Sequence, residues 1–132
     1  MYGFTNNQRV AGLREARRII ASPNAWTKGA FARDSDGKGC SPMSKDAVSW
    51  CATGVLGLAC TKIEGGKLKL GSLMHAELMR DLSYMVLEAA KSDEPFLNDW
   101  NDPESTTHAD VINAFDAAIS EVEKLDDKDR IV

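Results

Sequence analysis

The stretch Ser72–Lys91, SLMHAELMRDLSYMVLEAAK, decides the fold class of this 132-residue chain. Its apolar residues recur at three- and four-residue spacing, which is the period of an α-helix. They are Leu73, Met74, Leu78, Met79, Leu82, Met85, Val86 and Ala89. Ser72 stands where an N-cap is expected. Because the apolar surface is wide, we expect this helix to be the central element of a helical bundle.

Two further segments with the same period are predicted helices at the two ends of the chain. The first, NNQRVAGLREARRIIAS over 6–22, has Thr5, Asn6 or Asn7 as alternative N-caps and ends before Pro23, which cannot continue a helix. The last, TTHADVINAFDAAISEVEKL over 106–125, carries one apolar stripe. Its members are Val111, Ile112, Phe115, Ala118, Ile119 and Val122.

The remaining helix is predicted over SKDAVSWCATGVLGLAC, 44–60, with Ser44 as its cap and Ala47, Val48 and Cys51 on its apolar face. Gly54 weakens this helix by about 1 kcal/mol relative to alanine, so we expect a neighbouring backbone or ring to pass close to it.

The segment between the first two helices is expected to form a small insert. DSDGKG, 34–39, is dense in turn residues, so segments 30–33 and 38–42 are predicted to pair as a hairpin, with Trp26 and Phe31 turned inward. The segment 62–71 is expected to be a turn followed by an exposed extended stretch. The fold class is therefore mainly α: a four-helix bundle-like fold with a short β-hairpin or irregular insert after the first helix.

Length and composition predict one soluble domain. We expect a single domain over 1–132, with an ordered helical core over 6–125 and a frayed acidic tail over 126–132. No apolar run approaches the roughly 20 residues of a membrane helix, and the N-terminus does not read as a secretory signal. Three cysteines without regular spacing do not suggest a disulfide framework. We therefore expect a reduced, cytoplasmic protein without membrane contact.

The net charge of −4 is unevenly distributed along the chain. Up to Arg33 there are six basic residues and one acidic residue, whereas from Asp93 onward there are twelve acidic and three basic residues. We expect the basic first helix to pack beside the acidic last one. The alternative is that Arg14, Arg17 and Arg18 form a small anion-binding patch. The pI of about 5.1 disfavours direct nucleic-acid binding.

The segment DWNDPESTTHADV, 99–111, contains the residues that look most like a site. Thr107 and Asp110 have the spacing of a capping box, which makes His108 a first-turn residue with an exposed ring. Asn101 and Asp102, ahead of a proline, predict an Asx-turn. Alternatively, the segment lines a binding groove together with aromatic and polar residues from other parts of the chain, as ligand pockets do. The candidate ligand- or partner-binding residues are Trp26, Phe31, Arg33, Trp50, Trp100, Asn101, Asp102 and His108.

Two catalytic arrangements stand as alternatives to binding. His108 could perform acid–base chemistry with Asp102 or Asp34, or Cys51 could act as a nucleophile beside His75 or His108. Cys51 is predicted on an apolar helix face, where burial raises a thiol pKa. His75 shares a helix row with leucines, which suits a histidine bonded to a carbonyl group.

No metal ion or cofactor is predicted. The sequence has no C-x-x-C, H-x-x-x-H or E-x-x-H pattern, and DSDGKG lacks the ligand spacing of a calcium loop. Its glycine-rich segments lack the strand–turn–helix context of a phosphate loop.

Several segments together resemble a small domain family of unknown function found in bacterial and bacteriophage proteins. They match L-x-x-A-x-x-x-I, W-x-x-G-A-x-A-x-D-x-x-G, W-C-x-x-G and W-N-D-x-x-x-T-T-H-x-x-V-x-x-x-F-D-x-A, between Leu13 and Ile119. The resemblance implies a bacterial or phage origin and an intracellular domain, and it implies no catalytic residue.

The leading functional hypothesis is a non-enzymatic intracellular binding protein whose partner is a protein or a small molecule. By association, such proteins are often phage or mobile-element accessory proteins that modulate a host protein, including host defences. The alternatives are a small hydrolase- or transferase-like enzyme using His108 with Asp102 or Asp34, and an acidic decoy that imitates nucleic acid.

Overall fold

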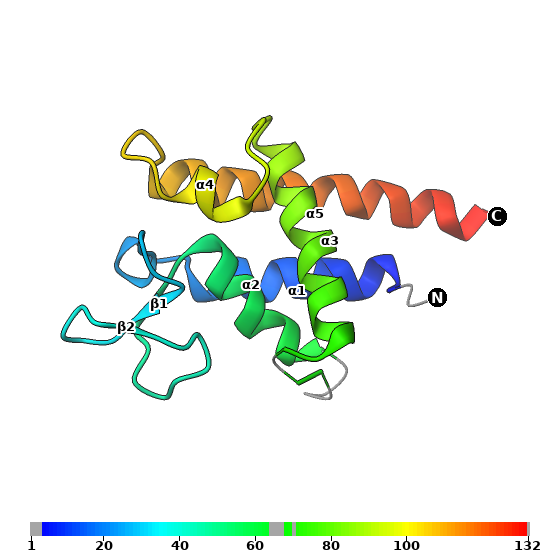
Figure 1. Cartoon of the computed structure of the whole chain (residues 1–132). Helices are drawn as coiled ribbons and strands as arrows, with labels where there is room; N and C mark the ends of the chain where they lie inside the picture. The colour runs from blue at the N-terminus through cyan, green and yellow to red at the C-terminus, as the bar shows by residue number, and fades with distance from the viewer. Residues whose placement is uncertain (1–3, 64–67, 70, 132) are drawn as a thin grey trace.

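The computed structural model describes residues 4–63, 68–69 and 71–131, with side chains up to Leu125. Within these residues the chain forms five α-helices (Figure 1): α1 (Asn6–Ile19), α2 (Ala52–Thr61), α3 (Leu73–Ala89), α4 (Leu97–Asn101) and α5 (His108–Ile131). A small sheet follows α1, so the predicted mainly α fold with a β insert is confirmed. No helix in the described ranges has both the length and the apolar character needed to cross a membrane.

Two expectations fall partly outside the described residues. Positions 64–67 and 70 of the expected extended stretch are not described, and the neighbouring Leu68 is buried. Helix α5 continues to Ile131, but the side chains of 126–131 and residue 132 are not described. The frayed tail therefore stays a prediction.

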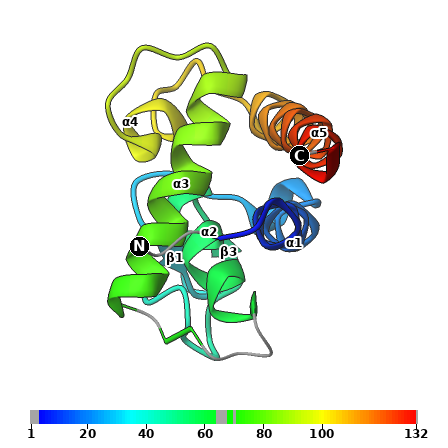
Figure 2. The same cartoon turned by 90° about the vertical axis from the view of Figure 1, so that its right-hand side faces the viewer.

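Helix α3 is the central element of the bundle, as its wide apolar surface predicts. Helices α1 and α5 lie side by side and run in opposite directions, and α3 crosses both of them (Figures 1 and 2). Helix α3 also packs against α2 and α4, so it contacts each of the other four. The small α4 lies within the connector between α3 and α5.

The core is made from the predicted apolar stripes. Burying one such side chain stabilises the fold by about 1.5–3 kcal/mol. The stripes of the three longest helices supply Leu13, Ala16, Ile20, Leu78, Leu82, Val86, Val111, Phe115, Ala118 and Val122. The buried face of α3 is narrower than predicted, because Leu73 and Met74 in its first turn are exposed.

Side-chain caps fix where three helices begin. Thr5 and Gln8 form a reciprocal capping box at α1, which selects Thr5 from the three alternatives. At α3, Ser72 Oγ accepts from the His75 amide at 3.2 Å. At α5, Thr107 Oγ1 accepts from the Asp110 amide at 3.1 Å, and Asp110 Oδ2 accepts from the Thr107 amide at 2.9 Å. The predicted capping box is thus confirmed.

The prediction that α2 begins after Ser44 is wrong, because α2 begins at Ala52 with Cys51 as its N-cap. The preceding residues pair with the sheet instead: the Val48 amide donates to the Arg33 carbonyl at 2.8 Å. Val48 is therefore exposed at the edge of the insert rather than on a helix face. Strand pairing, a long-range interaction, outcompetes the helical pattern here.

The insert is a three-stranded antiparallel sheet rather than a simple hairpin. Its strands β1 (Ala32–Arg33), β2 (Gly39–Cys40) and β3 (Ser49–Trp50) lie in the order β2-β1-β3. The β1–β2 pair is the predicted hairpin, and β3 adds the third strand. The turn η1 (Pro23–Ala25) leads into it, and Trp26 forms a bridge to β3.

Phe31 and Trp26 behave differently from each other. Trp26 packs partly buried against the core, as predicted. Phe31 is 52% exposed, so the prediction that it turns inward is wrong. Its backbone explains why: the Phe31 carbonyl accepts from the Cys51 amide at 3.2 Å, which presses the chain against α2 and leaves the ring outside.

Gly54 permits that contact. A Cβ atom at Gly54 would lie 1.9 Å from the Phe31 carbonyl oxygen and 2.8 Å from its carbonyl carbon. The predicted close approach of a backbone is thus confirmed, because only glycine lets the sheet insert lie against the first turn of α2.

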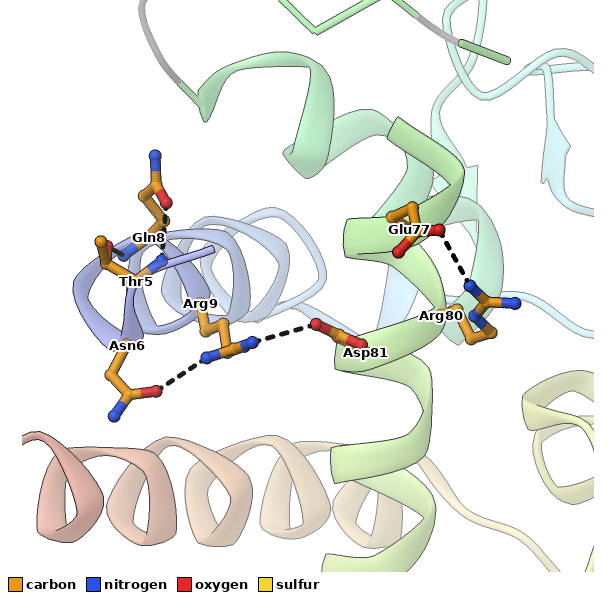
Figure 3. A network of polar contacts seen from close by, with 7 residues as sticks. All are labelled: Thr5, Asn6, Gln8, Arg9, Glu77, Arg80 and Asp81. Atoms are coloured by element: carbon orange, nitrogen blue, oxygen red, sulfur yellow. Dashed lines mark hydrogen bonds and ion pairs between the residues drawn. The ribbon is translucent and has the colours of Figure 1, made fainter. Parts of the chain in front are cut away.

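Polar contacts also join the helices (Figure 3). Arg9 donates through Nη2 to Oδ2 of Asp81 at 3.2 Å, which links α1 to α3, and through Nη1 to Asn6 Oδ1 at 2.9 Å. On the outer surface of α3, Arg80 pairs with Glu77 at 3.2 Å. The first of these contacts ties α1 to the central helix.

The basic first helix packs beside the acidic last helix, as their charges predict. Arg17 pairs with Asp116 at 2.8 Å, and Arg14 pairs with Glu123. Arg18 pairs with Glu15 within α1 at 2.8 Å. The three arginines are therefore engaged by carboxylates, which disfavours the anion-binding patch.

We predict that Gly54→Ala destabilises the protein strongly. The new methyl group meets backbone atoms that cannot rotate away, and overpacking of this kind costs about 3 kcal/mol or more. The matched control is Gly39→Ala, whose Cβ would have its nearest contact at 3.7 Å, with Ala30. Thermal denaturation should show a large fall in Tm for the first variant alone. Equal Tm values would contradict the close approach.

We also predict that Glu15 contributes stability that is lost in acid. Hydrogen bonds from Arg18, and to a smaller extent from Lys62, lower the pKa of Glu15 from 4.5 to about 2. The contribution is therefore present above pH 4.5 and disappears as the pH falls toward 2. Glu15→Gln should lower the free energy of unfolding by about 1 kcal/mol at pH 7, after allowance for solvent screening.

Urea denaturation across this pH range checks the Glu15 prediction. The difference between wild type and Glu15→Gln should shrink below pH 4.5. The exposed connector residue Glu104 supplies the control variant Glu104→Gln, for which we expect a small difference. A difference for Glu15→Gln that is constant from pH 7 to 2 would refute the role of its charge.

Candidate functional site

Asn101 lies at the centre of the predicted site and is fully buried. Its Oδ1 accepts from Trp26 Nε1 at 2.7 Å and from the Ala52 amide at 3.0 Å. Its Nδ2 donates to the Thr27 carbonyl at 3.1 Å and to Asp102 Oδ1 at 3.0 Å. All four hydrogen-bonding positions of the amide are therefore used. The predicted Asx-turn is replaced by these mostly long-range bonds, because a buried amide must find partners wherever they lie.

Two more of the predicted site residues hold the sheet insert together. Arg33 donates to Thr27 Oγ1 at 3.1 Å and to the Gly37 carbonyl at 2.9 Å. Trp50 donates from Nε1 to the Pro42 carbonyl at 3.0 Å. The polar groups of both side chains are thus hydrogen-bonded within the chain.

His108 is not the exposed first-turn residue that the sequence suggested. Its Nε2 donates to the Ile20 carbonyl at 2.7 Å, and its ring lies 6.0 Å from the Trp26 ring, measured between centroids. Ile20 is the C-cap of α1, so the histidine satisfies a carbonyl that the helix end leaves without a helical partner. Half-buried Trp100 lies nearby in the sequence, and its carbonyl accepts from Thr106 Oγ1 at 2.6 Å.

Phe31 and Asp102 are the predicted site residues that reach an open groove, which we call the sheet groove. It lies between the sheet insert and the ends of α2 and α4, and its volume is about 510 Å³. The residues that line it are Gly29, Ala30, Phe31, Gly39, Cys40, Cys51, Asn98 and Asp102. Its size is that of a small-molecule or side-chain pocket.

Asp102 supplies the charge of the sheet groove. Its Oδ1 accepts from the Gly29 amide at 3.2 Å and from Asn101 Nδ2 at 3.0 Å, so the carboxylate is held in one orientation. The residue is exposed, and it is the charged member of the eight lining residues. The half-exposed Phe31 ring and the Asn98 amide line the same space. A fixed carboxylate beside an aromatic ring is chemically suited to a cation.

Cys51, which lines the groove, and Cys60 are poorly suited to nucleophilic chemistry. Burial raises the pKa of Cys51, and its Sγ accepts from the Gly54 amide at 3.2 Å as a helix cap. Burial also raises the pKa of Cys60 to about 12. Cys40, Cys51 and Cys60 are free thiols. A thiolate nucleophile needs a lowered pKa, so the geometry favours structural roles for Cys51 and Cys60.

The residues of the two catalytic alternatives have other partners. His75 donates from Nε2 to the Gly57 carbonyl at 2.8 Å, as the sequence predicts for a carbonyl-bonded histidine. Asp34 Oδ1 accepts from the Asp36 and Lys38 amides at 2.9 and 3.0 Å, which closes the β1–β2 turn. Among the described residues no hydrogen bond or ion pair joins a histidine to an aspartate, and no cluster of metal-ligand side chains forms.

The acidic residues of α5 whose side chains the structure describes divide between two flanks. Asp116 and Glu123 face α1 and pair with its arginines. Asp110 and Glu121 stand on the opposite flank, where they border hollows between α3 and α5. A nucleic-acid decoy needs a continuous acidic face, so this division disfavours a decoy surface on α5 up to Leu125.

Sequence reasoning missed part of the sheet groove. Asn98, Cys40 and the backbone of Gly29 come together only because α4 folds against the insert. The one available signal was a pair of glycines, Gly29 just before the predicted hairpin and Gly39 within its second segment, since glycines leave room beside a sheet.

We predict that Asn101→Ala destabilises the protein by at least about 3 kcal/mol. The variant leaves Trp26 Nε1, the Ala52 amide and the Thr27 carbonyl without their partner, and each buried unsatisfied group costs about 1–3 kcal/mol. Asn113→Ala is the control, because that asparagine is exposed on α5. Chemical denaturation should separate the two variants clearly. A loss below 1 kcal/mol for Asn101→Ala would contradict the central role of its amide.

Comparison with known proteins assigns the chain to a family. A family of unknown function, DUF6197, matches residues 6–121, which cover the helices from α1 through most of α5. No curated protein and no solved structure matches the chain. The match confirms the resemblance to a family of unknown function, and the chain therefore belongs to the family DUF6197.

Proposed function

We propose that the protein is a non-enzymatic binding protein that takes a cationic side chain of a protein partner into the sheet groove. The observation that carries this proposal is the pairing of Asp102, a carboxylate fixed at the groove, with the 52% exposed ring of Phe31. Hydrogen bonds within the chain engage the side chains of the other predicted site residues except Trp100, and Trp100 does not line the sheet groove. Phe31 and Asp102 are therefore the predicted site residues open to a ligand there.

The chemistry of the groove selects the ligand. A lysine or arginine side chain can donate to the carboxylate while its charge lies against the aromatic ring. Asn98 also lines the groove, and its Oδ1, which accepts from Thr53 Oγ1 at 3.4 Å, has a second lone pair for another donor of the same group. Because the bonds from Gly29 and Asn101 already hold Asp102, binding does not have to order the carboxylate.

The energy of such a contact indicates that the cation belongs to a larger partner. An exposed ion pair contributes about 0.2–1 kcal/mol, and an exposed cation–π contact about 0.5–1 kcal/mol. Together they bind a free amino acid only weakly. A side chain presented by a folded partner adds further contacts around the groove, so a protein partner fits better than a small molecule.

A cytoplasmic setting agrees with this function. The three cysteines are free thiols, and two of them are buried where a disulfide would not form with each other. The role hypothesised by association, a phage or mobile-element accessory protein that modulates a host protein, requires a docking surface of this kind and no catalytic group. We propose that role as the setting of the sheet groove.

Binding of a defined cationic probe tests the proposal. Titration of the ¹⁵N-labelled protein with the peptide acetyl-Gly-Arg-Gly-amide should shift the amide signals of Gly29, Phe31 and Asn98 progressively, with a dissociation constant of about 0.1 M, because the contact contributes only about 1–2 kcal/mol. The same peptide with citrulline in place of arginine has almost the same shape without the charge, and we expect it to cause no shift.

Asp102→Asn is the informative variant for this titration. The new amide keeps an Oδ1 acceptor for Gly29 and Asn101, so the fold should keep its Tm while binding of the arginine peptide is lost. Asp99→Asn is the matched control, since it removes an exposed charge three residues away that does not line the groove. Equal shifts in both variants, or equal binding of the citrulline peptide, would reject the proposal.

A further inference from the structure

We propose that a second groove, between α3 and α5, binds a basic amphipathic helix of a partner protein. This helix groove has a volume of about 540 Å³ and does not share a lining residue with the sheet groove. The side chains that matter for the argument are Tyr84, Glu88, Ala117, Glu121, Val122 and Leu125. The inference stands on these residues and does not depend on Asp102.

The groove has an apolar floor and apolar edges. Ala118 and Val122 are buried at its base, whereas Tyr84 is 64% exposed and Leu125 46% exposed at its sides. Along α5 these positions follow the three- and four-residue spacing of one helix face. Ala117 and Ala118 have small side chains, so the backbone of an added helix can approach α5 closely. Exposed apolar side chains gathered in a groove are typical of a helix-binding surface.

The groove is long enough for several turns of helix. A second hollow continues it toward the start of α5, because both are lined by Ala89 and Ala117. That hollow adds Trp100 and Asp110 to the lining. The distance along α5 from Asp110 to Leu125 is roughly 22 Å at 1.5 Å per residue, which corresponds to about four helical turns.

The charges around the groove select a basic partner. Three acidic residues line the two hollows, namely Glu88, Glu121 and Asp110, against the single base Lys91 among their described lining residues. Glu121 also pairs with Lys124 at 3.5 Å, but both side chains are more than two-thirds exposed, so this pair contributes little. The acids on the other flank of α5 are paired with α1, so they do not offset this surface. Lysine or arginine residues on the flanks of a docked helix would face the acidic rim.

The same charges argue against a second copy of this chain as the occupant. A symmetric dimer through the helix groove would place Glu88 and Glu121 of one copy near the same acids of the other. Like charges in an interface weaken it. A partner helix with apolar residues at i, i+3, i+4 and i+7 can pack against the apolar floor of the groove. Basic residues beside that apolar face can pair with the acidic residues of the rim.

The experiment uses a fluorescein-labelled model peptide of ~18 residues that forms an amphipathic helix with leucines on one face and lysines on its flanks. Fluorescence anisotropy measures its binding to the full chain at low and at physiological salt. Two control peptides are used. The first has the same composition in scrambled order, and the second has glutamate in place of each lysine. We expect the amphipathic basic peptide alone to bind, with weaker binding at higher salt.

Charge-reversed proteins locate the binding. The double variant Glu88→Lys and Glu121→Lys should weaken the affinity roughly tenfold or more. Glu94→Lys with Glu104→Lys changes the net charge equally at exposed positions outside the helix groove and should bind like wild type. Leu125→Gln should weaken binding by several fold at unchanged net charge. Asp102→Asn should have no effect, which separates this inference from the proposed function.

Three results would overturn the inference. The first is equal loss of binding in the two double variants, which would show a general charge effect. The second is equal binding of the scrambled peptide, which would exclude recognition of a helix face. The third is a wild-type dimer, detected by sedimentation, that dissociates in Leu125→Gln and excludes the peptide, because it would assign the groove to a second copy.

Discussion

The buried amide of Asn101 is the constraint on which the arrangement of the loops depends. A fully buried polar side chain is tolerated only when its hydrogen-bonding positions are filled, and here the partners come from the Trp26–Thr27 loop, the first amide of α2 and the neighbouring Asp102. Strands of two residues cannot fix the insert by themselves. The amide fixes it, because any other placement of α4 or the loop would leave several buried groups unsatisfied.

This constraint explains why most of the aromatic and polar residues predicted to form a site instead stabilise the fold. The ring N–H of Trp26 donates to Asn101, and the ring N–H of His108 donates to the end of α1. The guanidinium of Arg33 donates to groups within the insert and the loop before it. This framework in turn holds Asp102 at the sheet groove. A binding site gains affinity when its groups are already held in place, so the buried polar residues contribute to binding without touching the ligand.

Local patterns predicted the features that depend on local physics. Helical stripes, the capping box at Thr107 and the carbonyl-bonded His75 all follow from spacing within one helix. The close approach of a backbone to Gly54 could also be predicted, because glycine destabilises a helix and is expected there only where a larger side chain would not fit. The start of α2 could not be predicted, because it depends on pairing of β3 with a strand 16 residues away, where Arg33 lies opposite Ser49. The helix groove and part of the sheet groove escaped prediction for the same reason: they arise between elements that meet only in the folded chain.

A third hollow shares one lining residue with each of the two grooves, and this bears on how tightly a partner of the proposed kind would bind. A hollow of about 380 Å³ between α3 and α4 shares Asn98 with the sheet groove and Tyr84 with the helix groove. Phe96, 67% exposed, stands within it. A cation bound at Asp102 contributes little binding free energy by itself, and the same holds for a helix bound on α5. A partner that spans the hollow joins them, so the second contact forms at high effective concentration and the combined affinity exceeds that of either groove.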